Sequence, residues 1–212
     1  MIEDKQTNVT MLFEEASISE FIADKISEIR RIFLEVSEAA PIINQFPDFV
    51  SVIDPAAQIN VVAHDRKIVI SDQQVNPFES RNIEKFLNIV KKIDAKIERR
   101  FKVYGFNFVF WVNLQDNIPA IEKIKNWIPR GIIAEEEVLL GGGLNFAYQK
   151  SDIRRLIDGD PVYDDTFTNL RGVSFACNSQ FNNQTLPELN ELISSFNAEH
   201  IEFKKKIEGL LE

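Results

Sequence analysis

The side chains best suited to nucleophilic or metal chemistry are scarce in this chain and lie far apart. Cys177 is the single cysteine, and the two histidines are His64 and His200. A cysteine nucleophile needs an imidazole near it in the fold, and a zinc site needs several nitrogen or sulfur ligands at short spacings. The Gly-x-Ser-x-Gly and His-Glu-x-x-His motifs are absent. We therefore expect a buried, unreactive Cys177, and no catalytic residue, metal or cofactor.

Two other segments resemble ligand-binding loops without meeting their spacing rules. Carboxylate oxygens suitable for Mg²⁺ or Ca²⁺ come from Asp158, Asp160, Asp164 and Asp165. No glutamate follows at the position an EF-hand loop requires, and Pro161 interrupts the segment, so we expect a turn over residues 158–161. Residues 141–143 are three glycines without the Lys-Ser/Thr of a phosphate-binding loop, and they predict a turn or a bulge.

Anion binding is favoured by one local concentration of positive charge. Residues 81–102 hold eight cations and three acids. At about 100° per helical residue, one narrow stripe contains Arg81, Lys85, Lys92, Lys96 and Arg99. Such a stripe could hold a phosphate backbone or an acidic partner. The alternative is a solvated face whose cations are paired with acids elsewhere. No aromatic residue interleaves the stripe, which argues against stacking of single-stranded bases.

The most specific pattern lies in the last helix that the sequence predicts. Apolar residues recur there in a 3-4 heptad spacing, with one polar exception at His200. The stripe consists of Leu186, Leu189, Ile193, Phe196, His200, Phe203, Ile207 and Leu210. It packs either on the protein's own sheet or on a second copy or another protein. In an interface, His200 would fix the register and make association sensitive to pH.

Composition limits the class of protein. The chain has 212 residues, a net charge of −9 and 17 phenylalanines, which suggests a large aromatic core. The acidic balance argues against attraction of the whole protein to nucleic acid or anionic lipid. The sequence lacks both a secretory signal pattern and an apolar run of about 20 residues. A single cysteine fits the reducing cytoplasm.

The first half alternates strands and helices. We expect strands over residues 8–14, 49–53, 58–64, 67–71 and 103–114. Helices are expected after a capping box at Ser17–Glu20, ending before Pro41, and over residues 77–101. This βαββαβ order is that of a ferredoxin-like split βαβ layer. Phe106, Phe108 and Phe110 should lie under the helices, with Asn107 and Trp111 on the other face, against solvent, the second half or another subunit.

The second half predicts a smaller αβββ unit and a long C-terminal helix. We expect a short helix over 118–128, strands over 144–149, 153–157 and 173–181, and a capping box at Thr185–Glu188 before the final helix. The fold class is therefore α+β. Two domains, 1–116 and 117–212, or one compact domain both fit this pattern.

The stretch Arg100-Phe-Lys-Val-Tyr-Gly-Phe-Asn-Phe, together with the order of elements, resembles a sporadically distributed family of uncharacterised prokaryotic proteins. That family carries an Arg-Ile-Gly-Leu-Arg-Tyr-Ile-Asn-like strand in mid-chain. Gly105 matches its glycine, and Asn107 or Asn113 its asparagine. The resemblance implies a topology and no chemistry.

These patterns favour a non-catalytic interaction or assembly protein of the cytoplasm. Its heptad stripe would form a homodimer or join a larger assembly. The alternative is phosphate or nucleic-acid binding through the basic stripe. An enzyme with an unrecognised site is the third hypothesis.

Overall fold

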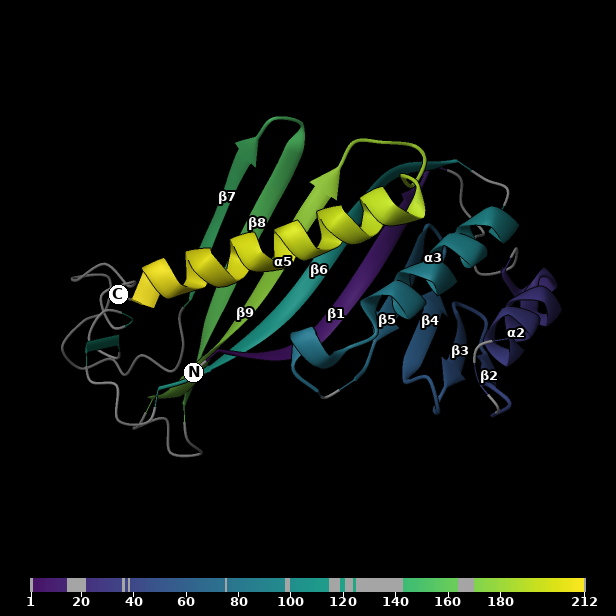
Figure 1. The fold of residues 1–212 in the computed structure, drawn as a ribbon, viewed down its shortest axis with the longest axis horizontal. Coiled ribbons are helices and arrows are strands. Elements are labelled where there is room, and N and C mark those ends of the chain that lie inside the picture. Colours follow the sequence, from purple (N-terminus) through teal and green to yellow (C-terminus); the bar gives the residue numbers. More distant parts are fainter. Residues whose placement is uncertain are drawn as a thin grey trace.

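The computed structural model describes residues 2–14, 22–35, 37, 39–74, 76–97, 100–114, 119–120, 124, 143–163 and 170–211. In these ranges the chain folds as a mixed α+β structure built on one antiparallel sheet (Figure 1). No helix in them is long and apolar enough to cross a membrane.

The sheet has nine described strands in the order β2-β3-β4-β5-β1-β6-β9-β8-β7. The strands are β1 (Ile2–Phe13), β2 (Ile42–Gln45), β3 (Val50–Asp54), β4 (Ile59–Ala63), β5 (Lys67–Asp72), β6 (Phe101–Asn113), β7 (Leu144–Lys150), β8 (Ile153–Tyr163) and β9 (Leu170–Phe181). Pairing of β6 with β9 carries the sheet across the predicted domain boundary. Residues 116 and 117 themselves lie outside the described residues.

One face of the sheet carries the helices. These are α2 (Ile26–Leu34), α3 (Ile83–Ile97) and α5 (Leu189–Leu211), preceded at α3 by a short 3₁₀ turn, η1 (Phe78–Ser80). Helix α5 runs diagonally across β7, β8, β9 and β6, and α2 and α3 lie beside one another towards the β2–β5 side of the sheet (Figure 1). Among the described elements, the opposite face has no helix.

The core is aromatic and centres on β6. Phe106, Phe108 and Phe110 are fully buried on the helix side, as their alternation predicts. The ring centroid of Phe108 lies 4.9 Å from that of Phe196 and 5.9 Å from that of Phe203, both on α5. Rings at these separations gain quadrupolar attraction in addition to area burial.

The face without helices carries a row of amide side chains. Asn178 Nδ2 donates to Asn107 Oδ1 at 2.6 Å, and Asn107 Nδ2 donates to Asn8 Oδ1 at 2.7 Å. The three residues occupy one register across β9, β6 and β1. Asn107 and Trp111 therefore lie on the face predicted for them, and both are half-buried.

Several boundaries differ from the sequence prediction. The helix predicted over 77–101 begins at Ile83 and ends at Ile97. The reason lies at Arg81, whose backbone is extended, so that Asn82 becomes the cap and accepts a hydrogen bond from the Lys85 amide. The C-terminal helix begins at Leu189, later than a capping box at Thr185 implies.

Two strand predictions also need correction. The turn expected at residues 158–161 is the continuation of β8. Pro161, which has no amide to donate, lies beyond Gly159, the last β8 residue that pairs with the described part of β7. Strand β2 has no counterpart in the sequence prediction. The predicted capping box at Ser17–Glu20 and most of the predicted 118–128 helix lie outside the described residues.

A glycine in the sheet tests the packing of the helix-free face. A Cβ added at Gly172 would lie 2.4 Å from Trp111 Cζ2 and 2.5 Å from the Val112 carbonyl oxygen. Gly172→Ala should therefore lower the free energy of unfolding by about 1–3 kcal/mol. Chemical denaturation measures the loss.

Gly209→Ala is the matched control, because nothing lies within 4 Å of its added Cβ on α5. It should leave stability unchanged or raise it by up to about 1 kcal/mol. Equal losses for the two variants would contradict the placement of Trp111 over Gly172.

Candidate functional site

The heptad stripe of α5 packs on the protein's own sheet. Five of its eight residues are buried within the single chain: Leu186, Phe196, His200, Phe203 and Ile207. The other three are partly buried against the same core: Leu189, Ile193 and Leu210. The intramolecular alternative therefore describes this stripe, and the prediction that it is an interface is wrong for the buried residues. A wide aromatic sheet accepts the same apolar spacing that a partner helix would require.

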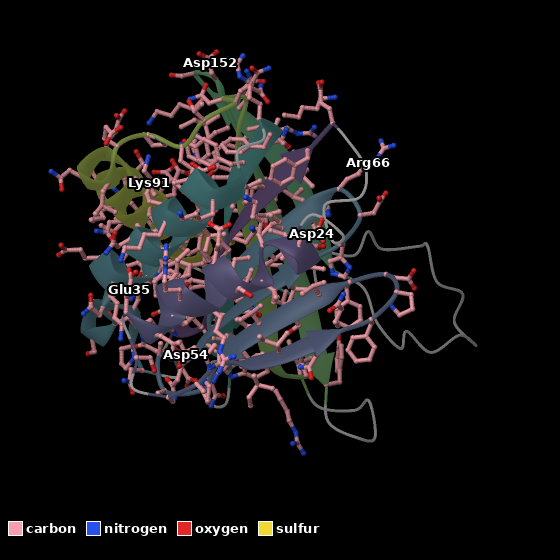
Figure 2. The ribbon with its side chains drawn as sticks, turned by 90° about the vertical axis from the view of Figure 1, so that its right-hand side faces the viewer. Asp24, Glu35, Asp54, Arg66, Lys91 and Asp152 are labelled. Atoms are coloured by element: carbon pink, nitrogen blue, oxygen red, sulfur yellow. The ribbon has the colours of Figure 1, made fainter. Side chains whose placement is uncertain are left out.

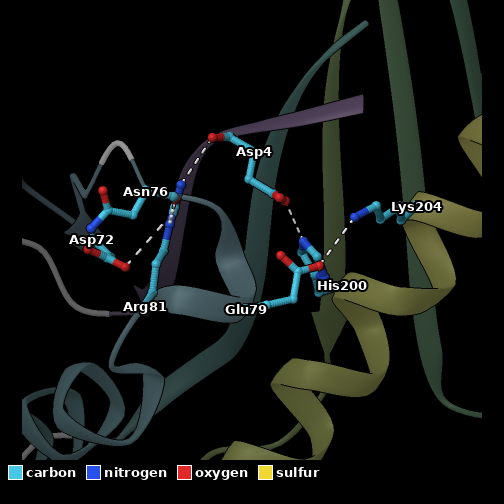
Figure 3. A network of polar contacts seen from close by, with 7 residues as sticks. All are labelled: Asp4, Asp72, Asn76, Glu79, Arg81, His200 and Lys204. Atoms are coloured by element: carbon cyan, nitrogen blue, oxygen red, sulfur yellow. Dashed lines mark hydrogen bonds and ion pairs between the residues drawn. The ribbon is translucent and has the colours of Figure 1, made fainter. Parts of the chain in front are cut away.

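His200 binds the first strand of the chain. Its Nε2 lies 2.5 Å from Asp4 Oδ1 (Figure 3). Its ring stacks on that of Phe78, with the centroids 3.6 Å apart. A bulge in β1 between Asp4 and Gln6 makes this contact available. Without the extra residue, strand alternation would direct Asp4 to the same face as Gln6, away from α5.

Arg81 binds the backbone next to the Asp4–His200 contact. Its side chain is fully buried, and it donates from Nε to the Asn76 carbonyl (2.8 Å) and from Nη2 to the Asp4 carbonyl (3.1 Å). Its Nη1 lies 3.9 Å from Asp72 Oδ2 (Figure 3). Burial raises the pKa of Asp72, and the Arg81 charge opposes this shift. Arg81 is therefore a structural cation and does not belong to a solvent-facing stripe.

Two hollows flank the Asp4–His200 contact. One, of about 430 Å³, is lined by Asp4, Glu79 and Lys204 among others. The other, of about 780 Å³, lies between the start of α3 and α5 and is lined by Phe78, Glu79 and His200 among others. Lys204 pairs with Glu79 at 3.3 Å between them. The charged groups of this corner are thus engaged with one another.

An imidazole held by a carboxylate is suited to acid–base chemistry when a reacting group reaches it. Here phenylalanine rings surround His200: the centroids of Phe108 and Phe110 lie 5.5 and 5.3 Å from it. Within the described ranges, no group of three or more His, Cys, Asp or Glu side chains is placed to hold a metal ion. The arrangement joins the first strand to the last helix.

Two lysines of the basic stripe form ion pairs with glutamates at helix α2. Lys92 Nζ lies 2.8 Å from Glu35, and Lys96 Nζ lies 3.3 Å from Glu28. The hydrogen bond from Lys92 lowers the pKa of Glu35, and hydrogen bonds from Lys25 and then Lys96 lower the pKa of Glu28. Arg81 is buried and is therefore not available to a ligand. Lys92 and Lys96 keep 37% and 38% of their side chains exposed, and anion binding by the stripe stays a prediction. Lys85 is half-buried on α3, and Arg99 lies outside the described residues.

The remaining predicted candidates do not come together. Cys177 is buried on β9, and burial raises its pKa, which makes the thiol unreactive. Asp158 and Asp160 lie on β8, while Asp164 and Asp165 lie outside the described residues. Of the three glycines at 141–143, only Gly143 is described.

Sequence reasoning missed a buried ion pair under α5. Arg155 on β8 donates from Nε (2.7 Å) and Nη2 (2.5 Å) to Glu199 on α5, and Ser179 Oγ donates to the same carboxylate at 2.5 Å. Both charged side chains are more than nine-tenths buried. A signal was present, because Arg155 lies between Ile153 and Ile157 at an inward position of the strand alternation.

The exposed apolar surface concentrates at one edge of the sheet. Strand β2 is an edge strand, next to α2 (Figure 1), and Figure 2 looks onto this side of the molecule. Of the seven exposed large apolar residues described, four lie between residues 34 and 46: Leu34 (48% exposed), Ile42 (52%), Ile43 (37%) and Phe46 (51%). Such an edge is a ready template for another strand.

The chain before β2 is fixed in place by a buried carboxylate. Asp54 Oδ1 accepts hydrogen bonds from Ser37 Oγ and from the amides of Ala56 and Ala57. After β2, the Phe46 amide donates to the Phe49 carbonyl, and the two rings stack with centroids 4.6 Å apart. The edge is thus held at both ends.

A scan against protein-family models and a search of curated proteins found no match for this chain. The candidate surface therefore rests on geometry alone.

The buried ion pair gives a stability prediction. Glu199→Gln leaves Arg155 as a buried charge without its counter-ion, which should cost about 3–5 kcal/mol of unfolding free energy. Glu35→Gln, in the exposed pair with Lys92, is the control and should cost less than about 1 kcal/mol. Denaturant titrations compare them, and equal costs would contradict a fully desolvated Arg155–Glu199 pair.

Asp4 gives a prediction for pH dependence. Burial alone would raise the pKa of Asp4, but the hydrogen bond and charge of His200 bring it below its usual 3.8. A lowered carboxyl pKa stabilises the fold above the unfolded-state value and loses this contribution as pH falls through the folded value. Asp4→Asn should therefore reduce the loss of stability between about pH 5 and pH 2.

Asp94→Asn should act in the opposite direction, since burial raises the pKa of Asp94. A carboxyl with a raised pKa gains stability as pH falls, so its removal should steepen the acid loss. Unfolding free energies measured across this pH range test both signs. The same pH profile for Asp4→Asn and wild type would contradict the Asp4–His200 contact.

Proposed function

We propose that the protein is a non-catalytic interaction protein that binds its partner by accepting an extended strand along edge β2. The observation that carries this proposal is the exposure of Ile42 and Ile43 on the edge strand itself and of Phe46 directly after it. In strand addition, main-chain hydrogen bonds supply affinity and alternate side chains supply specificity.

The sequence of β2 suits such pairing. Ile42–Gln45 contains two isoleucines and two amides and no charged side chain. Natural edge strands are usually protected by charges, prolines or bulges within the strand. Within its paired residues, β2 pairs with β3 without a register shift. Among the described strands none pairs with its outer side, so its main-chain groups there are open to a further strand beside apolar side chains.

The opposite edge is different in character. The exposed side chains of β7 are Asn145, Ala147, Gln149 and Lys150. Its inward aromatic Tyr148 lies under α5, with Lys206 Nζ 5.5 Å from the ring centroid. A polar edge ending in lysine disfavours further pairing, so β2 is the better acceptor.

Two finer features belong to the same proposal. The order β6-β1-β5-β4, with α2 and α3 on one face, supports a ferredoxin-like split βαβ layer in the first half, extended by β3 and β2. A single buried cysteine fits a cytoplasmic protein.

A peptide with the sequence of residues 40–47 tests strand addition directly. Added to isotope-labelled protein, it should shift the amide resonances of β2 and β3, with a dissociation constant on the order of 1 mM or below. Ile43→Lys places a charge at the edge and should abolish the shifts.

Ile201→Lys is the matched control, because Ile201 is an exposed apolar residue on α5, 64% exposed and away from this edge. It should bind the peptide as wild type does. Peptide-induced shifts confined to β7, or no shifts at saturating peptide, would overturn the proposal.

A further inference from the structure

We infer that the strand accepted by β2 is β2 of a second copy, paired antiparallel about a two-fold axis centred on Ile43. This inference rests on the proposed function and names its partner. It joins two nine-stranded sheets into one continuous sheet, with the helices of both copies on the same face.

The register follows from strand alternation. Directly opposed residues of an antiparallel pair point to the same face of the sheet. An axis perpendicular to the sheet therefore passes through a residue position and not between two. Centred on Ile43, it places Ile43 against Ile43 on the helix side, where Ile43 already neighbours buried Val52. Each register also sets two isoleucine–amide pairs, but an axis at Asn44 would make the central pair two asparagines, and an apolar central pair stabilises a sheet better.

The strand carries no charge that would repel a second copy of itself. Because Ile42–Gln45 is uncharged, a two-fold copy sets no like charges opposite each other in the new ladder. The exposed Phe46 directly after the strand is present on both copies. The net charge of −9 opposes association at long range, so salt should strengthen it.

The assembly closes at two chains. Each copy uses its only described apolar edge, and the polar β7 edges remain at the outside of the joined sheet. An isologous contact of this kind is complete in a C2 dimer. A four-residue strand buries less than the roughly 1,200 Å² of a stable interface, so dimerisation should be concentration-dependent.

Cysteine cross-linking tests the register. Ile43→Cys puts two thiols opposite each other at about the Cβ separation that a disulfide needs. Under mild oxidation it should give a covalent dimer about tenfold faster than Ile201→Cys, the exposed control. Asn44→Cys tests the alternative register. In the register centred on Ile43 its two copies would be about 7–8 Å apart and cross-link slowly, whereas in the register centred on Asn44 they would lie directly opposite each other. Cys177 is buried and should not contribute.

Sedimentation of the unmodified protein supplies the second measurement. The mass should rise with concentration towards twice 24.4 kDa and stop there. A monomer at all concentrations with equal cross-linking of the Ile43→Cys and Ile201→Cys variants would overturn the second-copy partner, and peptide binding would then decide strand addition separately. Faster cross-linking of Asn44→Cys would overturn the register, and masses above two chains would overturn closure.

Discussion

Burial of one face of a single wide sheet is the constraint on which this structure depends. The phenylalanines of β6 occupy the centre of that face, and Phe196 and Phe203 of α5 cover them. Apolar burial of this extent is the dominant favourable term in folding, and it commits α5 to its own chain. The apolar stripe of the last helix is therefore buried within its own chain, and we look to another surface for partner binding.

Polar contacts then fix where the helices lie. Glu199 and His200 are adjacent on α5, and they reach Arg155 on β8 and Asp4 on β1. Each contact joins segments that are distant in sequence. Its polar side chains lie at inward positions, where apolar residues are usual. Buried polar pairs contribute little net stability but lose much when one partner is removed. We interpret them as determinants of the register of α5 on the sheet. The edge at β2 lies far along the sheet from these contacts and retains its exposed apolar residues.

The sequence predicts what alternation and helical spacing encode. It places Phe106, Phe108 and Phe110 on the helix side and recognises the apolar stripe of α5. Spacing cannot distinguish a helix that packs on a sheet from one that packs on another helix, since both require the same stripe. The Asp4–His200 contact was not predictable, because it depends on a bulge defined by pairing with β6. Strand β2 escaped prediction because Ile42–Gln45 is short and does not alternate, and its importance comes from its edge position, which only the strand order reveals.

The central claim is that β2 is the edge at which the chain meets the same strand of a second copy. Hydrogen exchange of the backbone amides, measured at increasing protein concentration, tests it most directly. The account predicts that protection of amides in residues 42–45 increases with concentration while amides of β7 exchange at a constant rate. Concentration-independent exchange in β2, or new protection in β7 alone, would contradict it.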